Sequence, residues 1–309
     1  MPKPADIIGD IHGHADELEA LLKKLGYQEI DGAYTHPERR AIFVGDYIDR
    51  GKQNRRVVEI VRNMQTASNA FAVMGNHEYN AICYHTPDIQ RPGSYLRPHS
   101  QKNYEQHEAT LQEFEDDPQA LRDMINWFWT LPLCINLPKL RIIHACWDQA
   151  AVDRFLRHTN GCWLLDMDTL IESTQDGTDM HHCVETLLKG AEFELPEGIK
   201  FRDKDGNPRH HARLKWWLDD ADSLKDMVIG PPDLYSATKG QPTMPGEFPG
   251  YSENAPPVFF GHYWLTGTPE LQKPNVACLD YSVGKGDKLV AYRWDYEEEL
   301  SADRFIWVE

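Results

Sequence analysis

Apolar and polar positions follow two different periods along the first third of the chain. Short apolar runs have the length of buried strands, and the segments between them repeat apolar side chains every three to four positions, which is typical of amphipathic helices. The pattern predicts strands at residues 5–10, 40–46 and 70–76, and helices at 14–27, 54–64 and 77–85. This alternation predicts βαβ units around a largely parallel sheet.

The pattern changes after residue 85. Residues 86–120 are polar and weakly periodic, and residues 149–255 have the least regular pattern. The remaining predicted elements are a helix at 118–131, a hairpin at 133–137 and 140–145, a helical piece at 184–190, and strands at 257–262, 275–281, 288–294 and 304–308. Alternating elements first and strands last predict an α/β (α+β) fold, in which two packed mixed β-sheets are flanked by helices.

Charge and composition narrow the class of protein. The formal net charge of −17 repels polyanions, which argues against general binding to nucleic acid or to a membrane surface. No apolar run approaches the roughly 18–20 residues that span a bilayer, and the N-terminus has no apolar run of signal length. Six scattered cysteines without a CxxC pair predict reduced, mostly buried thiols in a cytoplasmic protein.

Three of the predicted strands end in a polar cluster that begins with glycine. The clusters are GDIHGH at 9–14, GDYIDRG at 45–51 and GNHE at 75–78. Two further histidines, His144 and His262, follow later strands. Because ligands of open α/β sheets bind outside the carboxyl ends of the strands, we expect these clusters to meet in one place.

Together these clusters offer two carboxylates, three imidazoles and one amide as metal ligands. The residues are Asp10, His12, Asp46, Asn76, His144 and His262. A nitrogen and oxygen set without thiolate suits manganese, which we prefer, or iron or zinc. Six ligands exceed the need of one catalytic metal, so we expect two divalent transition metal ions bridged by Asp46, an arrangement that hydrolyses phosphate esters.

Asn76 and His77 are neighbours at a strand end. If Asn76 binds a metal, His77 can face the substrate on the turning backbone and protonate the leaving alkoxide. Asp49 is available to orient this imidazole and to raise its pKa. Arg50 offers a planar fork for two phosphate oxygens.

Each of these residues also has a structural alternative. An isolated aspartate after glycine is usually a turn former or a helix cap, so the whole set, rather than any one member, favours a metal centre. Other polar and aromatic residues receive structural roles: His14 as a cap or surface residue, the pairs 181–182 and 210–211 as solvated histidines, 127–129 and 216–217 as packing, and Asp148 and Asp280 as structural or supporting carboxylates.

The motif order GDIHG, GDYIDRG, GNHE, a strand-end histidine and a final GH resembles that of the calcineurin-like metallophosphoesterases. The phosphoprotein phosphatase branch, which includes serine/threonine protein phosphatases and bacterial diadenosine tetraphosphatases, is the most similar. The resemblance covers residues 5–82 closely, with short anchors at 140–146 and 258–263. It implies the sandwich fold of that family.

The resemblance also implies how the roles are divided. It places Asp10, His12 and Asp46 on one metal; Asp46, Asn76, His144 and His262 on the other; His77 with Asp49 as the catalytic pair; and Arg50 on phosphate. The chain departs from the family at HAC (144–146), where His-Gly-Gly or His-Ala-Gly is usual, and at Lys52, where proline is common. The family's second phosphate-binding arginine matches no motif here, and Arg213 is the candidate.

The sequence therefore predicts a dinuclear metal-dependent phosphoesterase, in which metal-bound hydroxide attacks phosphorus in line. We expect phosphate monoesters, from a phosphoprotein or a small phosphorylated molecule, as substrates. The first alternative is hydrolysis of a dinucleoside polyphosphate of the diadenosine tetraphosphate type. The second is a non-catalytic scaffold, which the complete set of ligands with His77, Asp49 and Arg50 disfavours.

A single domain over residues 1–309 is expected, because ligands drawn from residues 10 to 262 must meet in one place. Insertions around 86–139 and 147–257 are expected to form the substrate walls. The sequence does not distinguish between oligomeric states.

Overall fold

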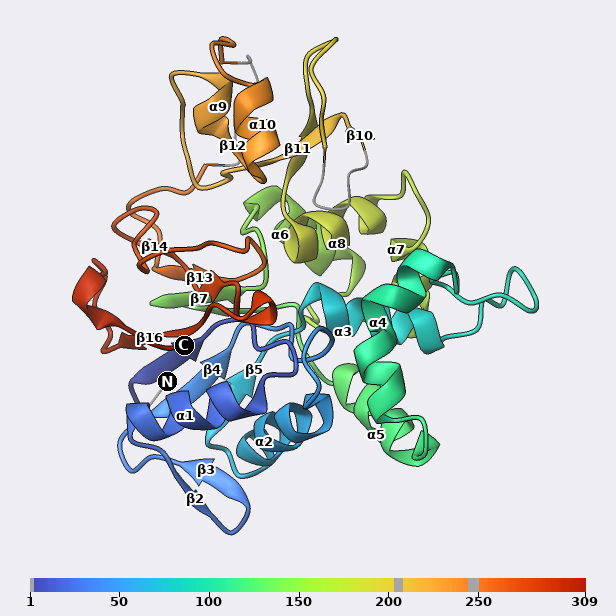
Figure 1. The fold of residues 1–309 in the computed structure, drawn as a ribbon, viewed down its shortest axis with the longest axis vertical. Helices are drawn as coiled ribbons and strands as arrows, with labels where there is room; N and C mark the ends of the chain where they lie inside the picture. Colours follow the sequence, from blue (N-terminus) through green and yellow to red (C-terminus); the bar gives the residue numbers. More distant parts are fainter. Residues whose placement is uncertain (1–2, 203–207, 244–249) are drawn as a thin grey trace.

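The computed structural model describes residues 3–202, 208–243 and 250–309 of the chain. Residues 203–207 and 244–249 of the predicted insertion 147–257 lie outside the described residues, as do residues 1–2. Figure 1 shows strands gathered in the middle of the molecule, with helices on both sides of them.

The elements alternate as predicted in the first third of the chain and become less regular afterwards. The strands are β1 (Ala5–Ile8), β2 (Gln28–Ile30), β3 (Ala33–Thr35), β4 (Arg40–Phe43), β5 (Ala70–Ala72), β6 (Cys134–Leu137), β7 (Leu140–Ile143), β8 (Glu192–Glu194), β9 (Phe201–Arg202), β10 (Pro208–Arg209), β11 (His211–Leu214), β12 (Val228–Ile229), β13 (Val258–Phe260), β14 (Val276–Cys278), β15 (Asp280–Tyr281), β16 (Lys288–Trp294) and β17 (Phe305–Val308). The helices are α1 (Ala15–Leu25), α2 (Asn54–Thr66), α3 (Asn76–His85), α4 (Gln101–Glu113), α5 (Pro118–Phe128), α6 (Gln149–His158), α7 (Met167–Ser173), α8 (Asp179–Lys189), α9 (Leu224–Met227) and α10 (Pro232–Ala237), with 3₁₀ turns η1 (Val283–Lys285) and η2 (Ala302–Arg304).

Two mixed sheets form the centre of the fold. The first has the strand order β15-β16-β1-β4-β5, with β17 paired to β16. Within it β1, β4 and β5 run parallel, whereas β16 is antiparallel to β1. The second sheet has the order β14-β13-β7-β6, in which β6 and β7 form the predicted hairpin.

Alternate residues of the first sheet face different layers, as the two-residue period of a strand requires. Ile7 and Ile42 belong to a buried cluster that also contains Ile142 and Phe259 of the second sheet. The next residues along the strands, such as Ile8, belong to a second cluster with the leucines of α1. The two sheets therefore pack against each other with helices outside, which confirms the predicted fold class.

Helix α1 illustrates how the sequence produces these layers. Leu18, Leu21, Leu22 and Leu25 recur at helical spacing and are buried, so the helix has one apolar face. Gly26 ends it with a left-handed φ of 94°, and its N–H is directed to the last carbonyls of the helix.

The chain contains elements that the pattern did not predict, among them the hairpin β2–β3 and helices α6 and α7, and two other departures concern predicted segments. Helix α4 forms inside the weakly periodic segment 86–120, where the apolar pattern gave no helix. The single strand predicted at 275–281 is broken at Leu279, because β14 pairs with β13 in the second sheet and β15 pairs with β16 in the first. The chain thus passes from one sheet to the other within one apolar run.

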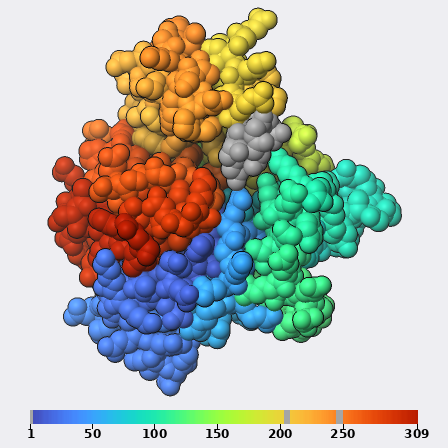
Figure 2. Space-filling model, viewed as in Figure 1, coloured from blue at the N-terminus to red at the C-terminus, as the bar shows by residue number. Residues whose placement is uncertain are grey.

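A small cluster of elements stands apart from the central sheets. Strands β8, β11 and β12 form a three-stranded sheet. Its apolar side chains pack with those of α9 and α10 in a core of their own, which includes Leu214, Leu224 and Leu234. Figure 2 shows this part projecting at the top of the molecule, in yellow and orange.

No helix in the described part of the chain is both long enough and apolar enough to cross a bilayer. The six cysteines form no disulfide, and all but Cys162 are buried, as predicted. Trp127, Phe128 and the pair 216–217 are also buried, which confirms their predicted packing role.

Strands β1 and β16 are fastened by a buried ion-pair network at one end of the first sheet. Arg39 donates from Nε to Asp6 Oδ1 at 2.9 Å, and its Nη2 donates to the carbonyls of Ala5 and Trp294. Arg293 donates to the same oxygen of Asp6 at 3.0 Å. Asp6 is fully buried, and these two guanidinium groups offset the cost of removing its carboxylate from water.

We expect Arg39→Met to lower the free energy of unfolding by about 3 kcal/mol, because it leaves the buried Asp6 with one cation, Arg293. It also removes the two hydrogen bonds to backbone carbonyls and the ion pair with Asp295. Lys139→Met is the control, since Lys139 pairs with Glu298 at the surface and its loss is expected to cost less than about 1 kcal/mol. Urea denaturation of the two variants measures both values. Equal losses would contradict a special role for the buried network.

Candidate metal centre

The site lies where strands of both sheets end. The backbone N–H of His12 donates to the carbonyl of Asp46 at 2.9 Å, and the N–H of Gly261 donates to the carbonyl of His144 at 2.8 Å. The first bond joins the loops after β1 and β4, and the second joins the loops after β7 and β13. Further hydrogen bonds connect these two pairs and bring in the cluster after β5. The clusters that the sequence places at separate strand ends therefore meet in one place.

The backbone at these strand ends is strained in a way that turns the side chains inward. His12, Asp46 and His262 have left-handed φ values of 48°, 54° and 73°, which are uncommon for residues other than glycine. Glycine is required beside them, because a Cβ on Gly75 would lie 2.3 Å from Asp46 N, and one on Gly261 would lie 1.8 Å from Asp10 Oδ1.

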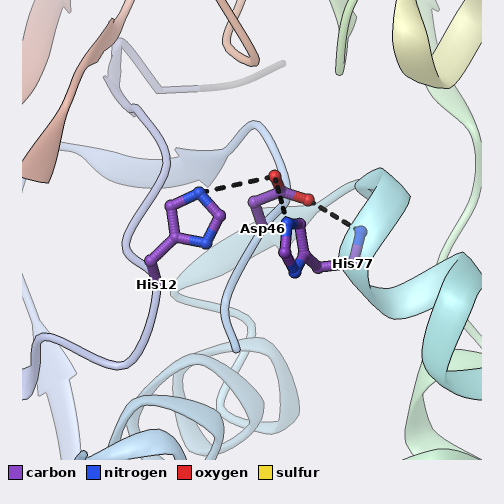
Figure 3. Close-up of side chains that lie close together, drawn as sticks. All are labelled: His12, Asp46 and His77. Atoms are coloured by element: carbon purple, nitrogen blue, oxygen red, sulfur yellow. Dashed lines mark hydrogen bonds and ion pairs between the residues drawn. The ribbon is translucent and has the colours of Figure 1, made fainter. Parts of the chain in front are cut away.

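His12, Asp46 and His77 form a first group, in which one nitrogen or oxygen atom of each side chain lies within 4.8 Å of the others. His12 Nε2 is 3.6 Å from Asp46 Oδ2, and His77 Nε2 is 3.9 Å from the same oxygen. Figure 3 shows both imidazoles beside the carboxylate, His77 extending from α3 and His12 from the loop after β1. All three residues are buried.

A second group lies on the other oxygen of the same carboxylate. His144 Nε2 is 3.4 Å from Asp46 Oδ1, and His262 completes this group. Asn76 Oδ1 is 3.1 Å from His144 Nε2 and 2.8 Å from His262 Nδ1. Asp46 is therefore common to both groups, the place that the sequence predicts for a bridging ligand.

Asp10 is held differently from the other residues. Its Oδ2 accepts a hydrogen bond from the backbone N–H of His262 at 2.9 Å, which leaves Oδ1 without a partner. His12 Nε2 and His262 Nε2 are also buried without a hydrogen-bond partner among the described residues. Buried polar atoms normally have hydrogen-bond partners. The oxygen and nitrogen atoms that have none here are therefore suitable ligands for divalent metal ions.

The electrostatic field of the site favours positive charge. Although burial lowers the pKa of His144, the carboxylate of Asp46 outweighs it and raises that pKa to about 10. Burial works against ionised Asp46, yet His144 and His77 hold its pKa well below the usual range. For His12 burial dominates and lowers its pKa to about 3, which keeps the imidazole neutral, the form that binds metals. The field that favours an imidazolium here equally favours a metal cation.

Glu78 supports the bridging carboxylate, a role that the sequence analysis did not assign to it. Its Oε2 accepts from the backbone N–H groups of Asp46 at 2.8 Å and Gly75 at 2.9 Å, and its Oε1 accepts from Tyr47 N at 2.8 Å. The only sequence feature that could have indicated this role is the position of Glu78 in the GNHE motif. Burial and the charge of Asp46 raise the pKa of Glu78 to about 7.

His77 and Asp49 are in direct contact. His77 Nδ1 lies 2.5 Å from Asp49 Oδ2, so its Nε2 is the nitrogen that faces Asp46. Burial lowers the pKa of His77, but the charges of Asp46 and Asp49 outweigh it and raise that pKa above its ordinary value. The sequence analysis did not find the two side chains that hold Asp49 from the other side, His107 and Thr110.

The two arginines predicted to bind phosphate are placed differently. Arg50 is exposed, and its guanidinium lies 5.5 Å from the ring centre of Trp264, whose indole also stacks on His12 at 5.2 Å. Arg213 lies on β11 of the projecting part and is 3.7 Å from Glu192. The pKa of His262 is lowered well below its usual value, first by burial and next by the positive charge of Arg213.

The residues given structural roles lie outside the two groups of ligand atoms. His14 is partly exposed and forms no side-chain cap, but pairs with Glu17 at 3.6 Å. Asp148 caps α6, and Asp280 accepts from the backbone N–H groups of Trp264 and Ser282. His181 bonds the carbonyl of Ser173, and the pair 210–211 is exposed.

Curated relatives are similar to this chain over a short segment. A bis(5'-nucleosyl)-tetraphosphatase PrpE (asymmetrical) from Halalkalibacterium halodurans is 48% identical over 73 residues, which are 23% of this chain and 30% of the relative. One from Oceanobacillus iheyensis is 48% identical over 73 residues, or 29% of its length. The chain thus spans less than a third of the length of these relatives.

One solved structure covers nearly the whole fold. A protein serine/threonine phosphatase from Saccharomyces cerevisiae matches 99% of this chain and 79% of its own, with a TM-score of 0.51 and 15% identity. At this level of identity the likeness concerns the fold alone.

The family model for calcineurin-like phosphoesterases matches residues 4–165, slightly more than half of the chain. This segment contains the three glycine-led clusters and His144. The chain belongs to the calcineurin-like phosphoesterases.

Proposed function

We propose that the chain is a dinuclear metal-dependent phosphoesterase that hydrolyses phosphate monoesters. The observation that carries the proposal is the meeting of two buried donor groups on the opposite oxygens of one carboxylate, Asp46. Asp10 and His12 would hold the first ion with Asp46. The second ion would take Asn76, His144 and His262 besides the same carboxylate.

Two ions bound there would lower the pKa of an attacking water and neutralise charge on the phosphoryl oxygens. The chain's own residues complete the reaction. Arg50 and Arg213 would bind and orient phosphate oxygens. His77, oriented by Asp49, gives the proton on Nε2 to the leaving oxygen as its bond to phosphorus breaks, so that the products are phosphate and an alcohol.

A second candidate substrate is a dinucleoside polyphosphate. The relatives that are 48% identical over 73 residues are named bis(5'-nucleosyl)-tetraphosphatases, which supports this alternative. Initial rates with Mn²⁺ on a phosphopeptide, p-nitrophenyl phosphate and diadenosine tetraphosphate separate the two. Faster hydrolysis of the monoesters is the expected result. Hydrolysis of diadenosine tetraphosphate alone would show that the substrate is a dinucleoside polyphosphate instead.

Replacement of the proposed acid, His77→Asn, is expected to lower kcat for an ester whose leaving oxygen needs a proton, such as benzyl phosphate, by about two to four orders of magnitude, the usual contribution of general acid catalysis. The metal content of the variant should equal that of the parent chain, because His77 is proposed to act on the substrate, with its Nδ1 bound to Asp49, and not to bind a metal. Elemental analysis beside the rate measurement checks both. Loss of an ion in this variant would make His77 a ligand instead.

Removal of the bridging charge, Asp46→Asn, is expected to release both ions together, because Asp46 contacts both ligand groups. Elemental analysis of the parent chain should find about two transition metals per chain, and none would favour the non-catalytic scaffold. His14→Asn is the control, since His14 pairs with Glu17 outside both groups. One ion retained at full occupancy in Asp46→Asn would argue against bridging.

A further inference from the structure

Asp49 is held on the side away from His77 by helix α4. Its Oδ1 accepts a hydrogen bond from Thr110 Oγ1 at 2.6 Å and contacts His107 Nδ1 at 2.8 Å, whereas Oδ2 contacts His77. An ionised carboxylate can only accept, so His107 Nδ1 carries the hydrogen of this bond. His107 is 5% exposed and Thr110 is fully buried.

Helix α4 also fixes the backbone around Asp49. Thr110 Oγ1 lies 3.2 Å from the backbone N–H of Asp49, which also donates to Asn54 Oδ1 at 2.7 Å. Glu113, one turn further along α4, accepts hydrogen bonds from the backbone and side-chain N–H groups of Asn54. Asp49 has a left-handed φ of 70°, so these bonds stabilise a backbone conformation that is unfavourable for an aspartate.

The charges around Asp49 agree with this arrangement. Burial works against its ionised form, but His107 and then His77 hold the pKa of Asp49 well below its usual range. His85 lies on the far side of His107, with 3.2 Å between their Nε2 atoms. Burial and the neighbouring His107 lower the pKa of His85 to about 4, so His85 is neutral and can donate to the free nitrogen of His107.

We propose that His107 is a positioning residue for the leaving-group acid, and that it acts by fixing the carboxylate of Asp49. The terminal torsion of an aspartate is broad, so a carboxylate bound through one oxygen can rotate. Donors from His107 and Thr110 on Oδ1 oppose that rotation and keep Oδ2 directed at His77 Nδ1. The inference rests on the proposed function, because it assumes that His77 protonates the leaving oxygen.

This inference changes the role of the predicted insertion 86–139. Helix α4 lies within it, and both buried residues of α4 are the two that contact Asp49. The insertion, predicted to form a wall for substrate, would therefore also contribute to the placement of the acid.

The test compares leaving groups, because a misplaced acid matters only when the leaving oxygen needs a proton. With the Mn²⁺-loaded full chain, His107→Leu should lower kcat for benzyl phosphate by roughly 10–100-fold, as expected for a misplaced catalytic group. With p-nitrophenyl phosphate, whose leaving group is stable as an anion, kcat should fall less than about threefold. KM and metal content should be unchanged, since His107 touches no proposed ligand or phosphate-binding residue.

Three further variants sharpen the result. His107→Asn keeps a donor near the place of Nδ1 and should recover most of the lost kcat. Thr110→Val removes the other donor without changing shape and should show a smaller loss of the same kind, which keeps the test valid if His107→Leu folds poorly. His85→Leu is the matched control, because His85 contacts His107 but not Asp49, and it should retain the parent leaving-group dependence.

The outcomes separate this inference from the proposed function. Equal losses on both substrates, no loss on either, no recovery with His107→Asn, or the same loss in His85→Leu would each overturn the positioning role. In contrast, a parent chain inactive on both esters, or a His77→Asn variant with no leaving-group dependence, would overturn the proposed function itself.

Discussion

The site depends on the burial of one negative charge. Asp46 is 2% exposed, and a carboxylate taken out of water is costly unless hydrogen bonds or opposite charges offset its desolvation. The backbone N–H of His77 donates to its Oδ1 at 3.0 Å, while imidazoles from three other loops approach its two oxygens. Loops far apart in the chain thus share one electrostatic requirement, which bound divalent cations would satisfy.

To bring these side chains together, the backbone at the strand ends adopts strained conformations, and glycine is needed where two segments come close. Inward-turned side chains at the strand ends need left-handed backbone at Asp46 and His262, and the neighbouring chain must come close enough to exclude a Cβ at Gly75 and Gly261. Glu78 stabilises the crowded turn by accepting three backbone N–H groups. A rigid, strained frame of this kind keeps ligand atoms in place before any ion arrives.

The two insertions approach this frame in different ways. The projecting part carries Arg213, whose positive charge lowers the pKa of His262. The net charge of the whole chain, in contrast, is −17. Helix α4 of the other insertion reaches Asp49 with His107 and Thr110. In a strongly acidic protein, a local positive charge such as that of Arg213 would offset the repulsion of a phosphate, as the proposed function requires.

The sequence by itself determined the parts of this protein that depend on local pattern. Residue types alone predicted the strand–helix alternation, the hairpin around Pro138 and the order of the glycine-led clusters. These features depend on periodicity and spacing among residues that are close together in the chain. Tertiary structure decided the rest. Helix α4 could not be predicted because its buried side chains, His107 and Thr110, are polar and give no apolar period. The break at Leu279 and the supports of Asp49 arise from contacts between distant segments, which no local pattern records.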